Sequence, residues 1–193
     1  MRRREFLALA AGIPYASSGA LIHLSLLPLF NEKYGTVSRD LLQTVSGALA
    51  NVYAIDVSTC KPERFKDPGD GEAVLDSISK RQGFAMAVIT APLRVPRRNG
   101  ATNIAGWADI PNDERERPRG SVITTAGLWS ARDGDVPLRL ATAAVHELGH
   151  NLGAWDCTDR ACYMNGKIDQ GLSLAPRAFC PKHREMLSAY LRS

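Results

Sequence analysis

The sequence of 193 residues has little excess charge of either sign. Its formal net charge is +4, and residues 21–193 hold 21 basic and 19 acidic residues, a net charge of +2. Nucleic-acid-binding proteins carry a dense basic face, so this near-neutral composition argues against such a partner. The sequence also lacks internal repeats, low-complexity tracts and linkers. With 45% hydrophobic residues, it has the composition of one globular domain with its own core.

The apolar run at the N-terminus is too short to span a membrane. It covers residues 7–13 and ends at Pro14. It follows Arg3 and Arg4, and residues 18–20 are small, so the segment resembles a bacterial twin-arginine signal peptide with its cleavage site. We predict that residues 1–20 are such a signal peptide. Residues 21–193 would then be exported to the periplasm or beyond, without stable membrane insertion. The alternative is a basic tail followed by an amphipathic helix.

Helical and strand patterns alternate along the rest of the chain. The apolar run 21–29 is consistent with a first strand that ends at Pro28, and Ser38 is a candidate N-cap for the first helix. Helices are expected at 38–50, 71–80, 137–153 and 181–191, and further strands at 53–58, 85–90, 103–108 and 121–125. This alternation predicts an α+β fold in which a mixed β-sheet carries packed helices.

Two histidines and a glutamate lie close together on the predicted helix 137–153. His146 and His150 are four residues apart, so their imidazoles lie on one helix face and can ligate one zinc ion. Glu147 lies one position round from His146, close enough to reach a water on that zinc without ligating it. In this interpretation zinc lowers the pKa of the water. Glu147 takes the proton and later gives it to the leaving amine.

A third ligand has to come from the chain beyond this helix. Gly153 can adopt a left-handed conformation and turn the chain sharply, which brings Asp156 back under the metal. Three protein ligands and one open position are what a catalytic zinc site requires. The alternative is a pair of surface histidines on an amphipathic helix. The extension through Gly153 and Asp156 makes that alternative a poor interpretation.

Three cysteines and a histidine follow at spacings typical of a closed, structural zinc site. They form two close pairs, Cys157 with Cys162 and Cys180 with His183. Zinc binding would order residues 157–193 into a small zinc-stabilised subdomain. The alternative is one disulfide with a free thiol, because exported proteins commonly hold disulfides. We therefore expect two zinc ions per chain, one catalytic and one structural.

These motifs together resemble the archaemetzincins, a family of metzincin zinc metallopeptidases. The resemblance rests on HELGHNLGAWDCTDRACYM at 146–164 and FCPKH at 179–183. It implies a metzincin-type twisted sheet with an active-site helix, and it makes Met164 the residue of the Met-turn, the hydrophobic base beneath the catalytic zinc. Two residues depart from the family pattern. Asp156 stands where a third histidine is usual, as in snapalysin-type metzincins, and His183 stands where a fourth cysteine is expected.

The predicted function is hydrolysis of peptide bonds by an exported zinc metallopeptidase, in which Glu147 activates a zinc-bound water. By the resemblance, residues 103–108 would form an edge strand that pairs with an extended peptide substrate. The alternative there is a surface loop with a buried Trp107. The alternative function is a catalytically silent, zinc-stabilised binding module. Such a module has no need of the Glu147 carboxylate, whose presence favours the enzyme.

Overall fold

The computed structural model of the chain describes residues 22–81, 83–95, 104–110, 120–128, 135–166 and 178–191. The predicted signal peptide lies outside these residues. Within them, no helix combines the length and the apolar character needed to cross a membrane. The elements in chain order are β1 (His23–Phe30), α1 (Arg39–Tyr53), β2 (Asp56–Thr59), β3 (Glu63–Arg64), α2 (Gly71–Ile78), β4 (Phe84–Ile89), β5 (Gly106–Ala108), β6 (Ser121–Thr124), the 3-10 helix η3 (Ala126–Leu128), α3 (Val136–Asn151) and α4 (Pro181–Tyr190).

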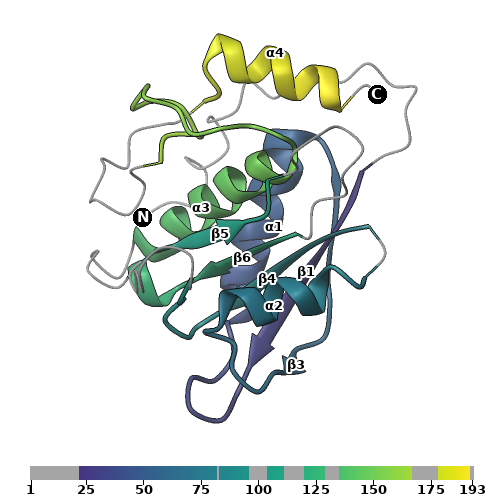
Figure 1. Cartoon of the computed structure of the whole chain (residues 1–193), viewed down its shortest axis with the longest axis vertical. Coiled ribbons are helices and arrows are strands. Elements are labelled where there is room, and N and C mark those ends of the chain that lie inside the picture. Colours follow the sequence, from purple (N-terminus) through teal and green to yellow (C-terminus); the bar gives the residue numbers. More distant parts are fainter. Residues whose placement is uncertain are drawn as a thin grey trace.

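The strands form one mixed sheet (Figure 1). Its order is β2-β1-β4-β6-β5, and β3 pairs with the C-terminal end of β1. Strands β2, β1, β4 and β6 are parallel, whereas β5 is antiparallel to β6 and lies at one end of this order. Parallel neighbours need crossover connections: α1 lies between β1 and β2, α1 and α2 both lie between β1 and β4, and β5 lies between β4 and β6. The predicted mixed sheet with packed helices is confirmed, and the edge strand expected within 103–108 is present as the shorter β5.

Helices cover both faces of the sheet (Figure 1). One face, which includes Leu26 and Met86, packs against α1 and α3. The other face, which includes Leu27 and Ala87, packs against α2. Successive strand residues point to opposite faces, which is why Leu26 and Leu27 join different cores. Helix α4 lies beyond α3, away from the sheet, and contributes Leu187 to the first core.

Helix α1 begins at the predicted N-cap and runs further than expected. The Ser38 hydroxyl oxygen accepts a hydrogen bond of 3.3 Å from the backbone N–H of Leu41, one of the donors that a first turn leaves without a helical partner. The helix continues to Tyr53, so the prediction that a strand begins there is wrong. The Tyr53 side chain is buried, and its hydroxyl donates to the Val145 carbonyl of α3 at 2.6 Å. This contact ties α1 to α3.

Strand β1 passes through Pro28 and ends at Phe30, so the prediction of an end at Pro28 is wrong. Pro28 still pairs with β4. On the other side of β1, the pairing with β2 ends at Leu26 and the pairing with β3 begins at Leu29. Proline has no N–H to donate to a ladder. It is tolerated here because one neighbouring strand has ended and the next has not begun.

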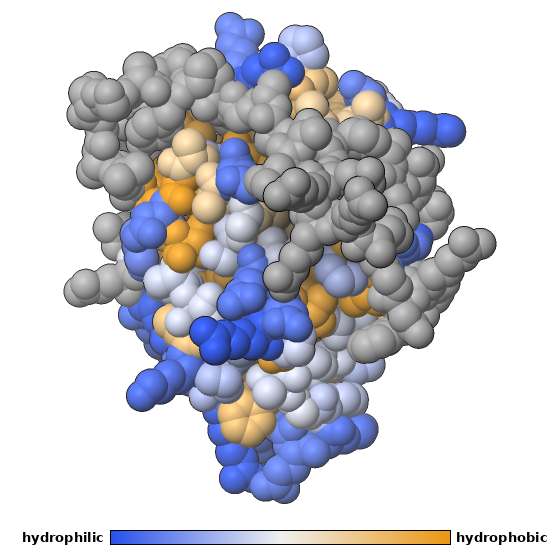
Figure 2. All heavy atoms as spheres, turned by 180° about the vertical axis from the view of Figure 1, so that it is seen from behind, coloured by the Kyte–Doolittle hydropathy of each residue, from blue (hydrophilic) through white to orange (hydrophobic). Residues whose placement is uncertain are grey.

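The face opposite to that of Figure 1 is mostly hydrophilic in its lower part, and hydrophobic side chains reach the surface higher up (Figure 2). Among the residues that the structure describes, Trp155 is the one exposed large hydrophobic side chain, with an exposed fraction of 66%. It lies in the segment that follows α3. This segment also carries the candidate metal ligands Asp156 and Cys157.

Candidate metal centre

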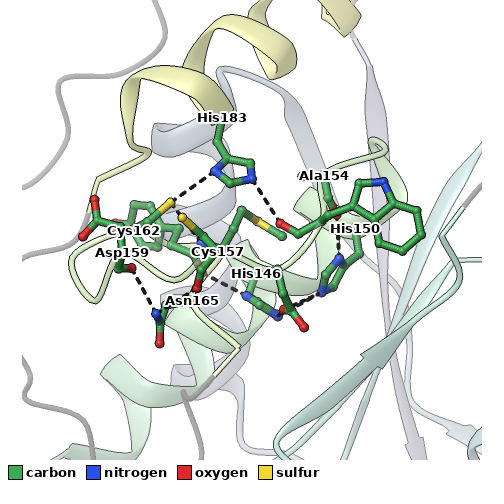
Figure 3. A network of polar contacts seen from close by, with 12 residues as sticks. His146, His150, Ala154, Cys157, Asp159, Cys162, Asn165 and His183 are labelled. Atoms are coloured by element: carbon green, nitrogen blue, oxygen red, sulfur yellow. Dashed lines mark hydrogen bonds and ion pairs between the residues drawn. The ribbon is translucent and has the colours of Figure 1, made fainter.

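Helix α3 brings His146 and His150 together (Figure 3). Their Nε2 atoms are 3.0 Å apart, and both side chains are buried. Nδ1 of His146 lies 2.9 Å from the carbonyl oxygen of Tyr163, and Nδ1 of His150 lies 2.7 Å from that of Ala154. A ring nitrogen beside a carbonyl oxygen donates its N–H, so each neutral imidazole keeps its lone pair on Nε2. Two lone pairs then face each other, an arrangement that a bound cation stabilises.

A turn after α3 places Asp156 beside this pair. Gly153 has a φ of 84°, in the left-handed region that glycine adopts without strain. Beyond the turn, Oδ1 of Asp156 lies 3.5 Å from Nε2 of His146 and 3.6 Å from Nε2 of His150. We call these three residues the His-His-Asp cluster. Its imidazoles are buried, but the Asp156 side chain is 60% exposed, so the cluster meets solvent on that side.

The donors of the His-His-Asp cluster fit a zinc ion. Tetrahedral zinc with ligands at about 2.0–2.1 Å separates neighbouring donor atoms by about 3.3 Å, close to the observed separations. Both histidines present one nitrogen to the cluster and hold the other on a carbonyl oxygen, as zinc-bound histidines do. Burial lowers the pKa of His150, but the nearby carboxylates of Asp156 and Glu147 raise it above its ordinary value. The cluster thus favours positive charge, which a metal ion supplies.

Glu147 lies under the edge strand β5. Its side chain is buried, and a Cβ atom built on Gly106 would lie 2.6 Å from its Cγ. Only glycine allows β5 to approach α3 this closely. Asn151, at the end of α3, donates its amide group to the carbonyl oxygens of Asp109 and Gly120, both at 2.9 Å. The end of β5 is therefore tied to the helix that carries Glu147.

Gly106 and Asn151 are not among the site residues predicted from the sequence. A glycine inside a predicted edge strand is a signal for close backbone approach, which could have identified Gly106. Asn151 follows the second histidine of the motif and carried no such signal. Its role depends on two carbonyl groups that are distant in the sequence.

A second group of donors lies next to the first. Cys157, Cys162, Cys180 and His183, here called the cysteine cluster, have ligand atoms within 4.8 Å of one another. The Cys157 and Cys180 sulfurs are 3.9 Å apart, and Nδ1 of His183 lies 3.0 Å from the sulfur of Cys180. All these cysteines are free, and 3.9 Å far exceeds the length of a disulfide bond, about 2.05 Å. Tetrahedral zinc with ligands at about 2.3 Å separates neighbouring sulfurs by about 3.8 Å.

The surroundings of the cysteine cluster suit thiolates bound to a cation. Burial raises the pKa of the Cys162 thiol, so ionisation there needs a nearby positive charge. Two backbone N–H groups, those of Met164 and Cys180, donate to the Cys162 sulfur at 3.4 Å. Asn165 braces the loop by donating to the carbonyl oxygens of Cys157 and Asp159. The two N–H groups that donate to the Cys162 sulfur favour its negatively charged form, whose charge a zinc ion would neutralise.

Comparisons with known proteins find archaemetzincins among the similar sequences and the similar structures. A scan of family models found no match. The archaemetzincin of Haloarcula marismortui is 27% identical, over 75% of this chain and 86% of that protein. The archaemetzincin structure from Methanopyrus kandleri superposes with a TM-score of 0.65 at 22% identity, covering 90% of this chain and 97% of that one. The archaemetzincin structure from Archaeoglobus fulgidus superposes with a TM-score of 0.63 at 16% identity, covering 85% of this chain and 99% of that one. The chain is archaemetzincin-like.

In this archaemetzincin-like chain, every residue singled out as a site residue lies at one of the two clusters or beside them. Met164 is fully buried, and its sulfur would collide with a Cβ atom on Gly149 of α3. The neighbouring Tyr163 carbonyl holds His146. Met164 and Tyr163 thus support α3 close to the His-His-Asp cluster. The two departures from the archaemetzincin pattern, Asp156 and His183, each lie in one of the clusters.

Proposed function

We propose that this chain is a zinc-dependent peptidase. The similarity to archaemetzincins supports a zinc metallopeptidase in general. The observation that carries the proposal is the convergence of the His146 and His150 lone pairs beside Asp156. These three residues would hold the zinc and leave a position for water and substrate. When bound, zinc would supply the Lewis acidity that polarises the scissile carbonyl group and acidifies water.

Glu147 is the general base in this proposal. It follows His146 on α3, is buried, and is not one of the donors that converge in the His-His-Asp cluster. Proton transfer therefore suits it better than metal binding. Its carboxylate would take a proton from the attacking water and give it to the leaving amine, which splits the peptide bond into an acid and an amine.

The proposed substrate is a peptide or protein that binds along β5. This strand pairs with β6 on one side, and no other described strand pairs with it. An extended peptide can add to such an edge through main-chain hydrogen bonds. Gly106 of β5 contacts Glu147, so a peptide bound there would pass next to the general base.

The cysteine cluster would hold a second, structural zinc, which would give two zinc ions per chain.

We further propose that residues 1–20 act as a twin-arginine signal, supported by Arg3 and Arg4 ahead of a short apolar run. The protein would then work in the periplasm or outside the cell. N-terminal sequencing of the exported protein tests this, and a full-length chain retained in the cytoplasm would contradict it.

Cleavage of a mixed peptide library by wild type and Glu147→Ala tests the peptidase proposal. We expect the wild type to cleave and the variant to be inactive with the same zinc content. Cleavage by the variant at the wild-type rate would show that Glu147 is not the base. A folded, zinc-loaded wild type that cleaves nothing would favour the silent binding module instead.

A further inference from the structure

His183 contacts two different parts of the molecule with its two ring nitrogens (Figure 3). Nδ1 lies 3.6 Å from the Cys162 sulfur and 3.0 Å from the Cys180 sulfur. Nε2 lies 3.1 Å from the carbonyl oxygen of Trp155. The ring is buried at the first turn of α4. A carbonyl oxygen can only accept, so the contact with Trp155 is a hydrogen bond only when the ring proton is on Nε2.

A metal ion in the cysteine cluster fixes that position of the proton. A histidine that ligates through Nδ1 carries its proton on Nε2 when neutral, and it then donates to the Trp155 carbonyl. Without a metal, Nδ1 can take the proton and donate it to the Cys180 sulfur. The Nε2 lone pair would then face the Trp155 oxygen, and the contact would become repulsive. Metal binding in the cysteine cluster therefore determines whether His183 donates a hydrogen bond to the Trp155 carbonyl.

The segment that this hydrogen bond holds connects the two clusters. The carbonyl oxygen of Ala154 accepts from an imidazole of the His-His-Asp cluster, and that of Trp155 accepts from His183 of the cysteine cluster. Asp156 belongs to the first cluster and Cys157 to the second. Four consecutive residues thus contact the two clusters in turn. Both chain neighbours of Asp156 are attached to the cysteine cluster: Trp155 through its hydrogen bond with His183, and Cys157 as a member of the cluster.

Asp156 is the ligand that depends most on this support. The exposed fraction of its side chain is 60%, whereas those of His146 and His150 are 7% and 11%. The two histidines are fixed by α3, by burial and by a carbonyl partner each. Asp156 lies outside any helix or strand, and a carboxylate on a short side chain reaches the metal only if its backbone is correctly placed.

We propose that His183 is a positioning residue for Asp156. Its hydrogen bond to Trp155 couples metal binding in the cysteine cluster to metal affinity in the His-His-Asp cluster. The inference rests on the ligand roles in the proposed function but not on peptide hydrolysis. It predicts that a change at His183 weakens a metal site to which His183 contributes no ligand.

A His183→Cys variant separates the two tasks of this residue. Four cysteines still form a sound zinc site, but a thiol that ligates zinc has no second donor for the Trp155 carbonyl. With Co²⁺ as the probe, thiolate-to-metal absorption reports the cysteine cluster and the weaker visible bands report the His-His-Asp cluster. Chelator competition then gives the affinity of each. We expect the cysteine cluster to stay filled and the affinity of the His-His-Asp cluster to fall about 10- to 100-fold, as when metal-bound residues lose an outer hydrogen-bond partner.

Trp155→Ala is the matched control, because it keeps the backbone carbonyl and removes only an exposed ring. Its metal affinities should equal those of the wild type. Equal affinity of the His-His-Asp cluster in wild type and His183→Cys would overturn the proposal, as would an equal loss in Trp155→Ala. If the variant misfolds, ¹⁵N NMR of His183 in the unmutated, zinc-loaded chain still tests the proposal. The ¹⁵N shifts of His183 should show a protonated Nε2, and a protonated Nδ1 would also overturn the proposal. Failure of peptide hydrolysis would leave these results unaffected.

Discussion

A Cβ atom on Gly106 of β5 would lie 2.7 Å from Oε1 of Glu147 on α3. The proposed substrate-binding strand and the proposed general base are therefore in direct contact, with only a hydrogen atom between the strand backbone and the carboxylate. Any larger side chain has to displace one of the two. The position of Glu147 thus depends on a residue that carries no reactive group.

Replacing Gly106 by alanine should lower kcat/KM for a peptide substrate about 100-fold, because a displacement of about 1 Å at a catalytic group has a cost of that order. Zinc content should not change, since the three atoms nearest to an added Cβ all belong to Glu147, which is not a proposed metal ligand. Steady-state kinetics with metal analysis checks both points.

Gly47→Ala is the control. Gly47 lies on α1 with nothing within 4 Å of its Cβ position, and alanine there should add about 1 kcal/mol of helix stability without changing activity. Wild-type kinetics for Gly106→Ala would contradict the prediction.

Met164 should contribute to stability through its volume. It is fully buried against α3, so Met164→Ala should lower the free energy of unfolding by about 2–5 kcal/mol, the usual cost of such a truncation. Met164→Leu keeps most of the volume and should cost less than about 1.5 kcal/mol. Denaturant unfolding of the zinc-loaded proteins measures both. Equal costs for the two variants would show that volume is not what Met164 supplies.

Local patterns predicted the elements that depend on local forces. The helix after Ser38 was predicted because its capping residue and its apolar spacing act within a few residues of each other. The start of a strand at Tyr53 was wrong because a tertiary contact, the hydrogen bond to Val145, draws that residue into the helical core. The end at Pro28 was wrong because proline's position depends on where two other strands stop and start.

The candidate site was predictable for the same reason, and only in part. His146 and His150 are brought together by a single helix, and Gly153 turns the chain locally, so their spacing carries the information. The approach of Gly106 to Glu147 joins a strand and a helix that are far apart in the sequence. The contact between His183 and Trp155 likewise depends on where α4 packs. No local pattern encodes such contacts.

Alkylation of the cysteines should depend on zinc. In the zinc-loaded protein the three cysteines of the cysteine cluster should resist iodoacetamide, because their sulfurs are held by metal. A chelator should make all three reactive. Cys60 lies outside both clusters and is partly buried, so its labelling should not depend on zinc in the folded chain and serves as the internal reference. Mass spectrometry counts the labels, and metal analysis should give two zinc ions per chain. A disulfide found without reduction, together with one zinc ion, would contradict the structural site.

Asp156 should be replaceable by another ligand but not by a residue without one. Loss of an outer hydrogen-bond partner weakens metal binding about 10- to 100-fold. Asp156→Ala should weaken zinc binding in the His-His-Asp cluster by more than this, because it removes a direct ligand. Asp156→His should retain zinc and peptide hydrolysis, because imidazole also ligates zinc and the exposed side of the cluster has room for a larger ring. Chelator competition on the two variants separates loss of a ligand from loss of the carboxylate. Wild-type affinity in Asp156→Ala would mean that the two histidines bind zinc without a third protein ligand, and the proposed ligand set would be wrong.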